Sequence, residues 1–514
     1  MNGIIIKLNK ITEVCYMALK IKLKNENLKF IRTIDPRLTS YNVEMTEVTG
    51  GTFWKEYTPE QVAGYGKFPI VGISNQEGVM QVYPPVDLYN PRVRKFAKEL
   101  GPVWIRVSGT WATKTYYDFD GDTNGVAPEG FQNLLTKEQW IGVLDFVKAV
   151  DGKLLVSVAN CEGIHSAHEP WNPSQAKLLF DFSRDYGVPI DAVEFMNEPN
   201  VLSVSGAPKG YTFDDFIRDQ DIFNAWIREN YPETLVVGPC SVGGGKMGKM
   251  KIEEGILKLV RNAVGTEKLL KGSKVKMDVF SYHYYNGISE RLAAGVHFAH
   301  WPANKAHTDE YLEAAGYCAN AAGKLRDKYM PGAQLWVTES GDACGGGCTW
   351  ASTYLDVLRT LNELGTFATI TDGVIFHNTL ASSAYGWLKH GTFDPRPNYF
   401  AVLLWNKLMG QTVYDSEIPV IEGAHVFCHS RKDGKEGCVY LVINNSLKEK
   451  TTVELPKDAT LYSLTGCGAM RATTMCLNGK PLMMGKDDEL PSIDGVSVSG
   501  TIELEPGSCS FIVM

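Results

Sequence analysis

Short apolar runs alternate with amphipathic segments through most of this 514-residue chain. Eight of the apolar runs have the length and composition of buried strands, and they lie at residues 38–45, 103–107, 153–159, 192–196, 235–238, 277–282, 335–338 and 373–376. The amphipathic segments predict helices at residues 136–150, 173–186, 213–229, 309–328 and 352–364. Eight strands that alternate with helices favour an α/β fold, a (β/α)8 TIM barrel, over an open sheet.

The alternation stops after about residue 410. Short strand-like runs separated by turn residues follow at 426–429, 437–444, 451–455 and 500–504, and they predict a β-sandwich. Two N-terminal runs, at 18–23 and 28–31, match this region in type. We therefore expect a poorly ordered tail at 1–16, strands at 17–37 that join the C-terminal β-domain, a barrel at 38–410 and the β-sandwich domain at 411–514.

Two of the predicted barrel strands end in a glutamate. The fourth leads into Asn197-Glu198-Pro199, and the seventh ends at Glu339. Either residue alone could be a helix cap or an ion-pair partner. In an eight-stranded barrel, however, strands four and seven face each other across the C-terminal mouth, where active sites lie. Two carboxylates about 5–5.5 Å apart serve a retaining glycosidase as nucleophile and as general acid and base.

Other residues near the predicted strand ends could bind a sugar. Asn197 lies beside Glu198, and Glu44 and Thr110 end strands one and two. Trp111 is our first choice for an aromatic platform that stacks on a sugar face. Tyr284, at the end of strand six, could hydrogen-bond Glu339 and hold it as a carboxylate.

Two neighbouring features favour an ordinary structural role when each is taken alone. We expect His283 to be a hydrogen-bonded structural histidine rather than a ligand or proton carrier. The run Gly345-Gly346-Gly347 follows Glu339 closely and is most simply a flexible turn. Glycines also let backbone N–H groups approach an anion, so the run could contribute to an acidic ligand's site.

Charge and cysteine content exclude several classes of protein. The formal net charge of −8 argues against a nucleic-acid partner, against binding to anionic membranes and, mildly, against gripping a long sulfated polymer. The 11 cysteines are odd in number and scattered, which favours a reducing compartment over a disulfide framework. No His/Asp cluster has metal-ligand spacing, so we expect neither a metal nor another cofactor. The N-terminal segment does not resemble a signal peptide, and we expect a cytoplasmic protein unless the start codon is mis-assigned and an exported form exists.

The strand-end motifs resemble a known group of enzymes. Asn197-Glu198-Pro199 together with Glu339 looks like the pair of clan A glycoside hydrolases. Within that clan, four segments are similar to glycoside hydrolase family 79, the heparanase and β-glucuronidase family. They are the stretch from Glu339 to Gly347, the motif His283-Tyr284-Tyr285, residues 393–399, and residues 34–40 followed by Glu44. The resemblance covers roughly residues 18–410.

The resemblance implies roles for individual residues. Glu198 would be the acid/base, Glu339 the nucleophile and Glu44 a binder of sugar hydroxyls. The carboxylate of a uronic acid would be held by backbone groups of Gly345 and Gly346 and by Tyr385.

The chain also departs from the family's pattern. It has Ser108-Gly109-Thr110 where the family more often has Gly-Gly-Thr, and this puts the role of Thr110 in doubt. The basic residues of a heparan-sulfate cleft are not clearly reproduced.

These observations favour a retaining enzyme that removes terminal β-linked glucuronic acid from small conjugates or oligosaccharides. One alternative is another clan A activity, of the xylosidase or arabinofuranosidase type, and another is an endo-acting, heparanase-like β-glucuronidase. A carbohydrate-binding protein without activity is the alternative outside the enzymes. We expect no nucleic-acid or membrane partner, and the sequence leaves the oligomeric state open.

Overall fold

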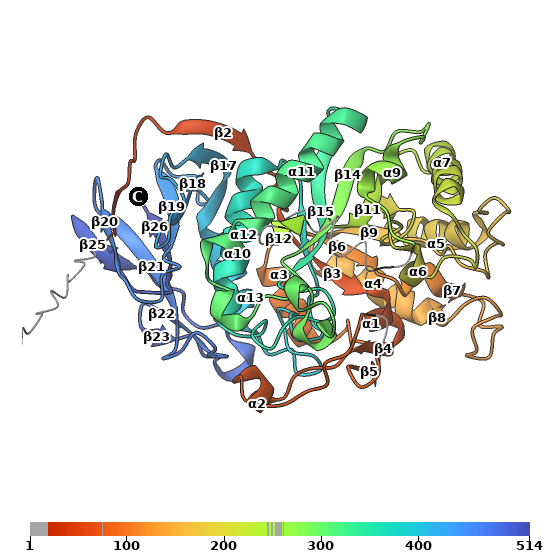
Figure 1. The fold of residues 1–514 in the computed structure, drawn as a ribbon, viewed down its shortest axis with the longest axis horizontal. Helices are drawn as coiled ribbons and strands as arrows, with labels where there is room; N and C mark the ends of the chain where they lie inside the picture. Colours follow the sequence, from red (N-terminus) through yellow and green to blue (C-terminus); the bar gives the residue numbers. More distant parts are fainter. Residues whose placement is uncertain (1–18, 74–75, 244–245, 248–249, 252–259, 261) are drawn as a thin grey trace, which may run out of the picture.

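A computed structural model describes residues 19–73, 76–243, 246–247, 250–251, 260 and 262–514. The tail predicted at 1–16 lies outside these residues. A closed barrel of eight parallel strands forms one part of the molecule, and a group of mostly antiparallel strands from the C-terminal part of the chain lies beside it (Figure 1). The predicted fold class is confirmed. The residue limits of the predicted domains stay a prediction.

The barrel strands follow one another around the barrel in sequence order. They are β3 (Thr39–Glu44), β6 (Val103–Ser108), β9 (Gly152–Ser157), β10 (Ala192–Glu194), β11 (Leu235–Val242), β14 (Val279–Tyr285), β15 (Gln334–Gly341) and β16 (Ile375–His377). Each overlaps one of the eight predicted strands. Because all eight are parallel, their C-terminal ends meet at one mouth.

Helices surround the barrel and account for the amphipathic segments. They are α3 (Pro91–Glu99), α4 (Lys137–Ala149), α5 (Ser174–Asp185), α7 (Phe213–Asn230), α9 (Thr266–Leu270), α10 (Asp309–Leu312), α11 (Ala314–Tyr329), α12 (Leu355–Ile370) and α13 (Pro397–Leu408). Thr136 caps α4, because its hydroxyl accepts the Gln139 N–H and the Gln139 side chain accepts the Thr136 N–H. The single helix predicted at 309–328 is instead two helices, α10 and α11, separated by Glu313.

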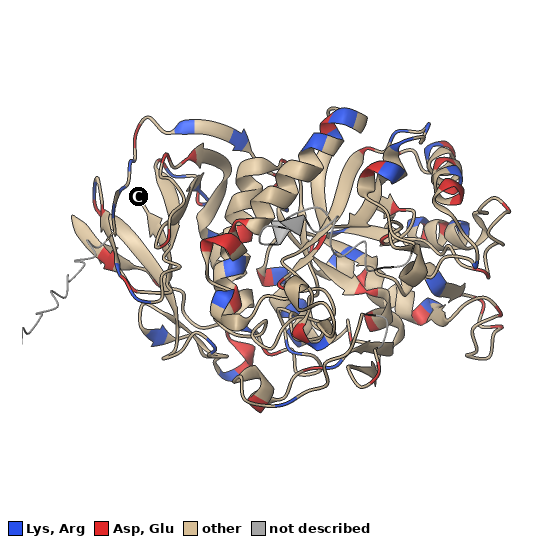
Figure 2. Ribbon diagram, in the orientation of Figure 1, with Lys and Arg blue, Asp and Glu red and all other residues tan. Residues whose placement is uncertain are grey.

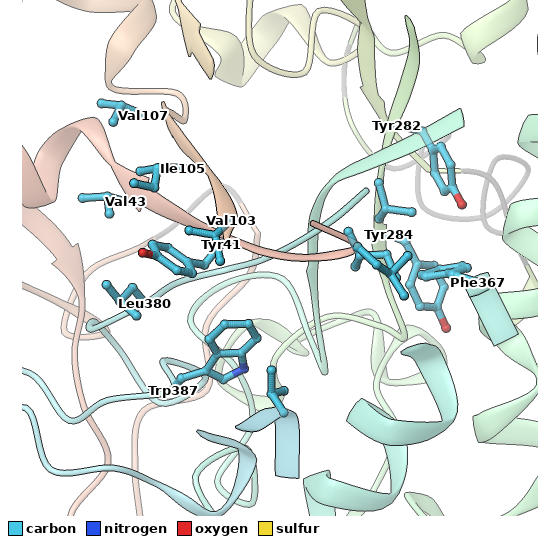
Figure 3. Packing of buried hydrophobic residues seen from close by; sticks show 14 of the residues in the cluster. Tyr41, Val43, Val103, Ile105, Val107, Tyr282, Tyr284, Phe367, Leu380 and Trp387 are labelled. Atoms are coloured by element: carbon cyan, nitrogen blue, oxygen red, sulfur yellow. The ribbon is translucent and has the colours of Figure 1, made fainter. Parts of the chain in front are cut away.

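Side chains alternate between the barrel interior and the surrounding helices. Along β6, Trp104 packs into the interior, whereas Val103, Ile105 and Val107 belong to the cluster between barrel and helices (Figure 3). Burying each of these aliphatic side chains stabilises the fold by about 1.5–3 kcal/mol. The alternation leaves Arg106 facing the barrel interior, where a charge needs partners.

Short elements lie on the loops between the barrel strands. They are α1 (Met45–Thr49), β4 (Gly51–Trp54), α2 (Pro59–Val62), β5 (Met80–Tyr83), β7 (Thr115–Asp118), β8 (Asn133–Thr136), α6 (Leu202–Ser205), β12 (Lys246–Met247) and β13 (Met250–Lys251). Of these, β4 pairs with β5, β7 with β8, and β12 with β13.

Two sheets form the β-region, and the N-terminal strands complete both. The strands are β1 (Leu19–Lys22), β2 (Lys29–Thr33), β17 (Met409–Asp415), β18 (His425–Arg431), β19 (Cys438–Ile443), β20 (Thr451–Glu454), β21 (Ala459–Gly466), β22 (Met475–Leu477), β23 (Lys480–Pro481), β24 (Val496–Val498), β25 (Thr501–Leu504) and β26 (Cys509–Val513). The first strand, β1, pairs with β20 in the small sheet, and β2 pairs with β17 at the edge of the large sheet. Side chains of both sheets, including Ile21, Val453 and Tyr440, share one buried cluster.

The cysteines of this region include one disulfide. Cys467 and Cys476 are joined, and the eight other cysteines of the described chain form no disulfide. The sequence favoured a reducing compartment over a disulfide framework and left open whether any two cysteines pair. The spacing of the cysteines in the sequence gave no indication of this pair, because it is brought together by the turn from β21 to β22.

The barrel and the β-region pack through α12. Gly365 on this helix allows the Phe427 ring of β18 to approach closely, since a Cβ at Gly365 would lie only 2.3 Å from that ring. Basic and acidic side chains are interspersed over the ribbon (Figure 2). In the part of the chain that the structure describes, no helix is both long and apolar enough to cross a membrane.

Candidate active site

An irregularity in β15 turns Glu339 into the barrel. Trp336 faces the interior, so strict alternation would point Thr338 inward and Glu339 outward. The register against β14 shifts at this point, however, and Val337 pairs with Tyr282 while Glu339 pairs with His283. A bulge of this kind re-aims the side chains that follow it. Glu339 therefore faces the mouth, and its side chain is only 8% exposed.

Glu198 reaches the same place from a loop. It follows β10 and adopts a left-handed backbone conformation with φ of 46°, which a non-glycine residue adopts only when its surroundings enforce it. The enforcing contacts are the Glu198 N–H, which donates to the Cys240 carbonyl at 3.1 Å, and Pro199, which fixes the chain that follows. The Glu198 side chain is 21% exposed, more than that of Glu339.

His283 lies between the two glutamates. Its Nδ1 is 2.9 Å from Glu198 Oε1 and 2.7 Å from Glu339 Oε2. One oxygen of each carboxylate and the imidazole nitrogen lie within 4.8 Å of one another. This spacing matches the roughly 5–5.5 Å of retaining glycosidases and not the roughly 6.5–9.5 Å of inverting ones.

The environment of Glu339 favours its ionised form. Burial alone would raise the pKa of this carboxyl group, but the charge and hydrogen bond of His283, together with the charge of Arg106, lower it to about 2. Burial likewise opposes the charged form of His283, yet the Glu339 carboxylate and the hydrogen bonds to both glutamates raise the pKa of His283 to about 9. At neutral pH the pair is therefore a carboxylate facing an imidazolium.

A buried arginine, Arg106, lies next to this pair in the barrel interior. Arg106 is fully buried and forms an ion pair with Glu194, with N–O distances of 2.9–3.1 Å. It also donates to Asn197 Oδ1 at 2.7 Å, and its Nη2 lies 3.3 Å from His283 Nε2. The carboxylates of Glu194 and Glu339 outweigh burial and raise the pKa of Arg106. Arg106 thus fixes Asn197, and its charge lies next to the imidazole ring.

Glu44 lies on the Glu339 side of the mouth and is almost completely buried. Burial, followed by the nearby Glu339 carboxylate, raises the pKa of Glu44 well above its usual range and so favours its protonated form. Its Oε2 is buried without a hydrogen-bond partner and rests against Gly109, where a Cβ would lie 1.6 Å away. A protonated carboxyl group with a free oxygen is suited to bind a sugar hydroxyl.

Asn378, directly after β16, connects the nucleophile candidate to two tyrosines. Its Nδ2 donates to Glu339 Oε1 and to the hydroxyl of Tyr285, both at 2.9 Å, and lies 3.2 Å from the hydroxyl of Tyr385. Tyr385, one of the expected carboxylate binders, is therefore near Glu339. Its loop is held by Arg396, which donates to the carbonyls of Ser383, Ala384 and Gly386.

The hydrogen bond that we expected from Tyr284 to Glu339 is not formed. The Tyr284 ring points away from the mouth and packs edge-to-face against Phe367 at 5.9 Å (Figure 3). Its hydroxyl is buried without a partner. The reason is strand alternation, since His283 and Tyr285 face the mouth and Tyr284, between them, faces the helices.

The remaining sugar-binding candidates lie on the loops after β6 and β10. Asn197 Nδ2 is 3.5 Å from Thr110 Oγ1, so these two residues are brought together. Trp111 is half-buried and packs edge-to-face against Phe53 at 5.2 Å. Its role as a stacking platform stays a prediction.

The glycine run forms a left-handed turn beside the mouth. Gly345, Gly346 and Gly347 all have φ between 79° and 89°, a conformation that other residues adopt rarely. Trp54 packs against Gly346, where a Cβ would lie 2.4 Å from the Trp54 Cβ. Neither Gly345 nor Gly346 donates its backbone N–H to another described residue. The run is therefore a rigid turn with free donors and not a flexible connection.

Several residues of the site were missed or undervalued in the sequence. His283 was expected to be structural, and Arg106, Glu194 and Asn378 were not considered. Asn378 carried a usable signal, since it directly follows a predicted barrel strand, as Glu198 and Glu339 do. Arg106 also carried one, because a charged residue in the middle of an apolar strand must find a buried partner.

The same cluster has the spacing of a small metal site. Among the described residues, Glu198, His283 and Glu339 are the one group of possible ligands close enough together. Their shared contact is His283 Nδ1, however, which donates to both carboxylates. A metal ion would need a lone pair on that nitrogen. The cluster is therefore better described as a hydrogen-bonded group than as a metal site.

The chain has relatives among known proteins, in sequence and in fold. No family model matches the chain. It is 25% identical to heparanase-like protein 1 of Arabidopsis thaliana over 84% of this chain and 85% of the relative. It is 24% identical to a hyaluronoglucuronidase of Hirudo nipponia over 84% and 90% of the two chains.

Among solved structures, a 4-O-α-L-rhamnosyl-β-D-glucuronidase of Fusarium oxysporum has a similar fold. The TM-score is 0.62 and the identity 11%, with 96% of this chain and all of the other covered. The comparisons confirm the resemblance to the heparanase and β-glucuronidase family, and the chain is accordingly a glycoside hydrolase.

Proposed function

We propose that this chain is a retaining β-glucuronidase that removes terminal glucuronic acid. The observation that carries the proposal is the bridging of Glu198 and Glu339 by His283, which leaves oxygens of the two carboxylates within 4.8 Å. Such a separation leaves no room for a water between nucleophile and sugar, as an inverting mechanism requires. The name of the Hirudo nipponia relative, hyaluronoglucuronidase, supports a glucuronide substrate.

In the proposed first step, a carboxylate oxygen of Glu339 attacks the anomeric carbon. Glu198 gives its proton to the glycosidic oxygen, the bond between that oxygen and the anomeric carbon breaks, and the aglycone leaves as an alcohol. The product is a glycosyl ester of Glu339. In the second step, Glu198 takes a proton from water, the water oxygen bonds to the anomeric carbon, and the ester bond breaks to restore the Glu339 carboxylate.

His283 and Asn378 hold the nucleophile in this scheme. The low pKa of Glu339, which His283 maintains, keeps the attacking group ionised. Asn378 fixes Oε1 at 2.9 Å and leaves Oε2 to His283, so the carboxylate has one orientation. Asn197, held by Arg106, is placed to bond the sugar hydroxyl next to the reacting carbon.

The uronic-acid carboxylate would be bound on the Glu339 side. The free N–H groups of Gly345 and Gly346 and the hydroxyl of Tyr385 are the proposed donors. Burial first, and then the carboxylates of Glu44 and Glu339, raise the pKa of Tyr385, so its hydroxyl keeps its proton. Glu44 and Thr110 would bind the remaining hydroxyls.

The test is hydrolysis of a set of 4-nitrophenyl glycosides. Turnover of the β-glucuronide, with a product that keeps the β configuration in its first NMR spectrum, is expected. The Glu339→Ala variant should lose about 10⁴-fold or more in kcat, and azide should restore activity by giving the α-glucuronyl azide. Preference for a neutral pyranoside or an arabinofuranoside would refute the substrate, and a product of inverted configuration would refute the mechanism.

An endo-acting enzyme is the second candidate, and one groove favours it. A groove of about 550 Å³ borders the Tyr385 loop and is lined by Ala384, Lys389, Arg396 and Arg471 together with Glu56. Its cations could accept a second acidic sugar unit. Loss of viscosity in hyaluronan before free glucuronic acid appears would establish endo action, and the reverse order would establish exo action.

A further inference from the structure

A second cavity, separate from the groove beside the Tyr385 loop, adjoins Glu198. It has a volume of about 150 Å³, and Glu198, His283 and Cys344 contribute to its walls. Neither Glu339 nor Tyr385 is among the described residues that line it. The cavity is therefore lined by the acid/base candidate and not by the nucleophile candidate, and its wall residue Leu292 packs against Gly345.

The rest of the wall is mostly aliphatic, and Tyr284 and Tyr285 are its two aromatic members. Its aliphatic side chains come from the ends of β10, β11 and β14, from the segment that follows β14, and from the neighbouring loops: Ile73, Val201, Val204, Val242, Val260, Ile288 and Leu292. No lysine or arginine lines the cavity within the described chain. The two titratable side chains Glu198 and His283 on its wall are already hydrogen-bonded to each other.

The position of Glu198 indicates what enters this cavity. A general acid must lie beside the glycosidic oxygen that it protonates, so the leaving group extends past it. The sugar side of the mouth is occupied by Glu44, Asn378 and Tyr385, which surround Glu339. The space beyond Glu198 is then left for the aglycone.

The lining determines the chemistry of that aglycone. A sulfated or carboxylated sugar in the cavity would lose its hydration and face the Glu198 carboxyl group. The one cation on the described wall is the His283 imidazolium, which is already hydrogen-bonded to both glutamates. An uncharged apolar group would instead gain about 25 cal/mol for each Å² of apolar surface that it buries. An aliphatic cavity of about 150 Å³ is large enough for one aromatic ring.

We propose that this cavity is the aglycone site and that the substrates are β-glucuronides of uncharged, apolar alcohols and phenols. The inference rests on the proposed β-glucuronidase activity and narrows it. It selects small conjugates over the interior of a sulfated polysaccharide.

Val204 is the position at which to test the cavity. It is 48% exposed at the rim, so a polar residue there should not disturb the core. Val420, on a loop of the β-region, is 49% exposed and serves as a matched control. The variants are Val204→Asp and Val420→Asp.

The substrates are methyl, cyclohexylmethyl and sulfated N-acetylglucosaminyl β-glucuronide. The wild type should hydrolyse the cyclohexylmethyl compound with a kcat/KM at least about tenfold above that of the methyl compound, as the burial of roughly 60 Å² of apolar surface implies. Val204→Asp should reduce this ratio by about tenfold, and Val420→Asp should leave it unchanged. Equal rates for the first two substrates, an unchanged ratio in Val204→Asp, or preference for the sulfated disaccharide would overturn the proposal.

Binding of cyclohexylmethanol, measured by calorimetry on wild type and variants, separates the two proposals. If no glucuronide is hydrolysed, the proposed function fails, and the calorimetry still decides whether the cavity accepts an apolar alcohol. Binding that Val204→Asp weakens and Val420→Asp does not is expected. Absence of binding by the wild type would refute the apolar site independently of catalysis.

Discussion

Glu198 and Glu339 face each other across the barrel mouth but lie in different surroundings. Glu339 is a strand residue, nearly buried and hydrogen-bonded to His283 and Asn378. Glu198 lies on a loop in a left-handed conformation, is more exposed, and has an apolar cavity on one side. One carboxylate is thus fixed among polar groups, whereas the other borders an apolar space.

The difference corresponds to what the two steps of a double displacement require. A nucleophile must stay ionised in one orientation, so dense hydrogen bonding and a nearby cation suit it. A group that alternately gives and takes a proton must exchange with the leaving group and with water, so it needs an open side. Four substitutions test this contrast.

Replacing Glu198 should produce the largest of these effects, and its size should depend on the substrate. In Glu198→Ala, kcat/KM for methyl β-glucuronide should fall about 10²–10⁴-fold, because an alkoxide needs the proton of a general acid. The 2,4-dinitrophenyl glucuronide, whose leaving group needs no proton, should lose far less in its first step. Steady-state kinetics and the amplitude of the dinitrophenol burst measure both.

Azide supplies the control for that variant. It should accelerate turnover in Glu198→Ala and give the β-glucuronyl azide, since the ester with Glu339 still forms. An equal loss of kcat/KM for both substrates, or an α-configured azide product, would contradict the assignment of Glu198 as acid/base and would indicate that Glu198 is the nucleophile.

Gly109→Ala should disturb the Glu339 side without touching either glutamate. A Cβ at Gly109 would lie 1.6 Å from Glu44 Oε2, so the buried Glu44 side chain must move. Because displacement by about 1 Å can cost roughly 10²-fold in rate, we expect kcat to fall about 10–100-fold. Initial rates on 4-nitrophenyl β-glucuronide, together with thermal unfolding, measure the outcome.

Gly101→Ala is the matched control for backbone strain. Gly101 has φ of 86°, close to the 90° of Gly109, but a Cβ there would meet nothing within 4 Å. Both variants should lose about 1–2 kcal/mol of stability from the left-handed conformation, and only Gly109→Ala should lose activity. Equal activities in the two would show that Glu44 does not contribute to the reaction.

His283→Gln should change the pH dependence of the nucleophile. In the wild type the pKa of Glu339 is about 2 and that of His283 about 9, so both groups keep their charge from pH 4 to 7. Burial raises the pKa of Glu339, and in the variant only the charge of Arg106 and the remaining hydrogen bonds oppose this effect. The pKa of Glu339 is therefore expected to rise. The fraction of ionised Glu339 in the variant should then decrease as the pH falls from 7 to 4.

Inactivation by 2-deoxy-2-fluoro-β-glucuronyl fluoride measures this directly, because a fluoride leaving group requires no proton from Glu198. The labelling rate should be level between pH 4 and 7 in the wild type and should fall towards pH 4 in His283→Gln. A level profile in the variant would mean that Arg106 and Asn378 suffice to hold Glu339 ionised.

The contrast between the two glutamates could be predicted only in part from the sequence. Strand order and the positions of Glu198 and Glu339 follow from apolar runs that end in polar residues, and the structure has all eight strands where they were predicted. The direction of Glu339 could not be derived, because it depends on a register shift against β14 that no local pattern encodes. The strained φ of Glu198 depends on a bond to Cys240 in another strand.

An error of one residue had a larger consequence on β14. Successive side chains on a strand face opposite ways. The prediction placed Tyr284 at the mouth, whereas its side chain faces the helices and the side chains of its neighbours His283 and Tyr285 face the mouth. The pairing of Cys467 with Cys476 was missed for a related reason, since it depends on a turn in the β-region.

Tyr284 and Tyr285 provide the smallest and most closely matched test. Tyr285→Phe removes a hydroxyl that accepts the Asn378 N–H at 2.9 Å, and with it one restraint on the amide that orients Glu339. The net contribution of such a bond is about 0.5–1.5 kcal/mol, so we expect kcat on 4-nitrophenyl β-glucuronide to fall about 2–10-fold. Tyr284→Phe removes a hydroxyl without a partner, and kcat should stay within about twofold, since apolar replacement of an unpaired group costs little. A larger loss in Tyr284→Phe than in Tyr285→Phe would mean that the helix-facing side of β14 also supports Glu339, and the two sides of the mouth would then differ less than their contacts indicate.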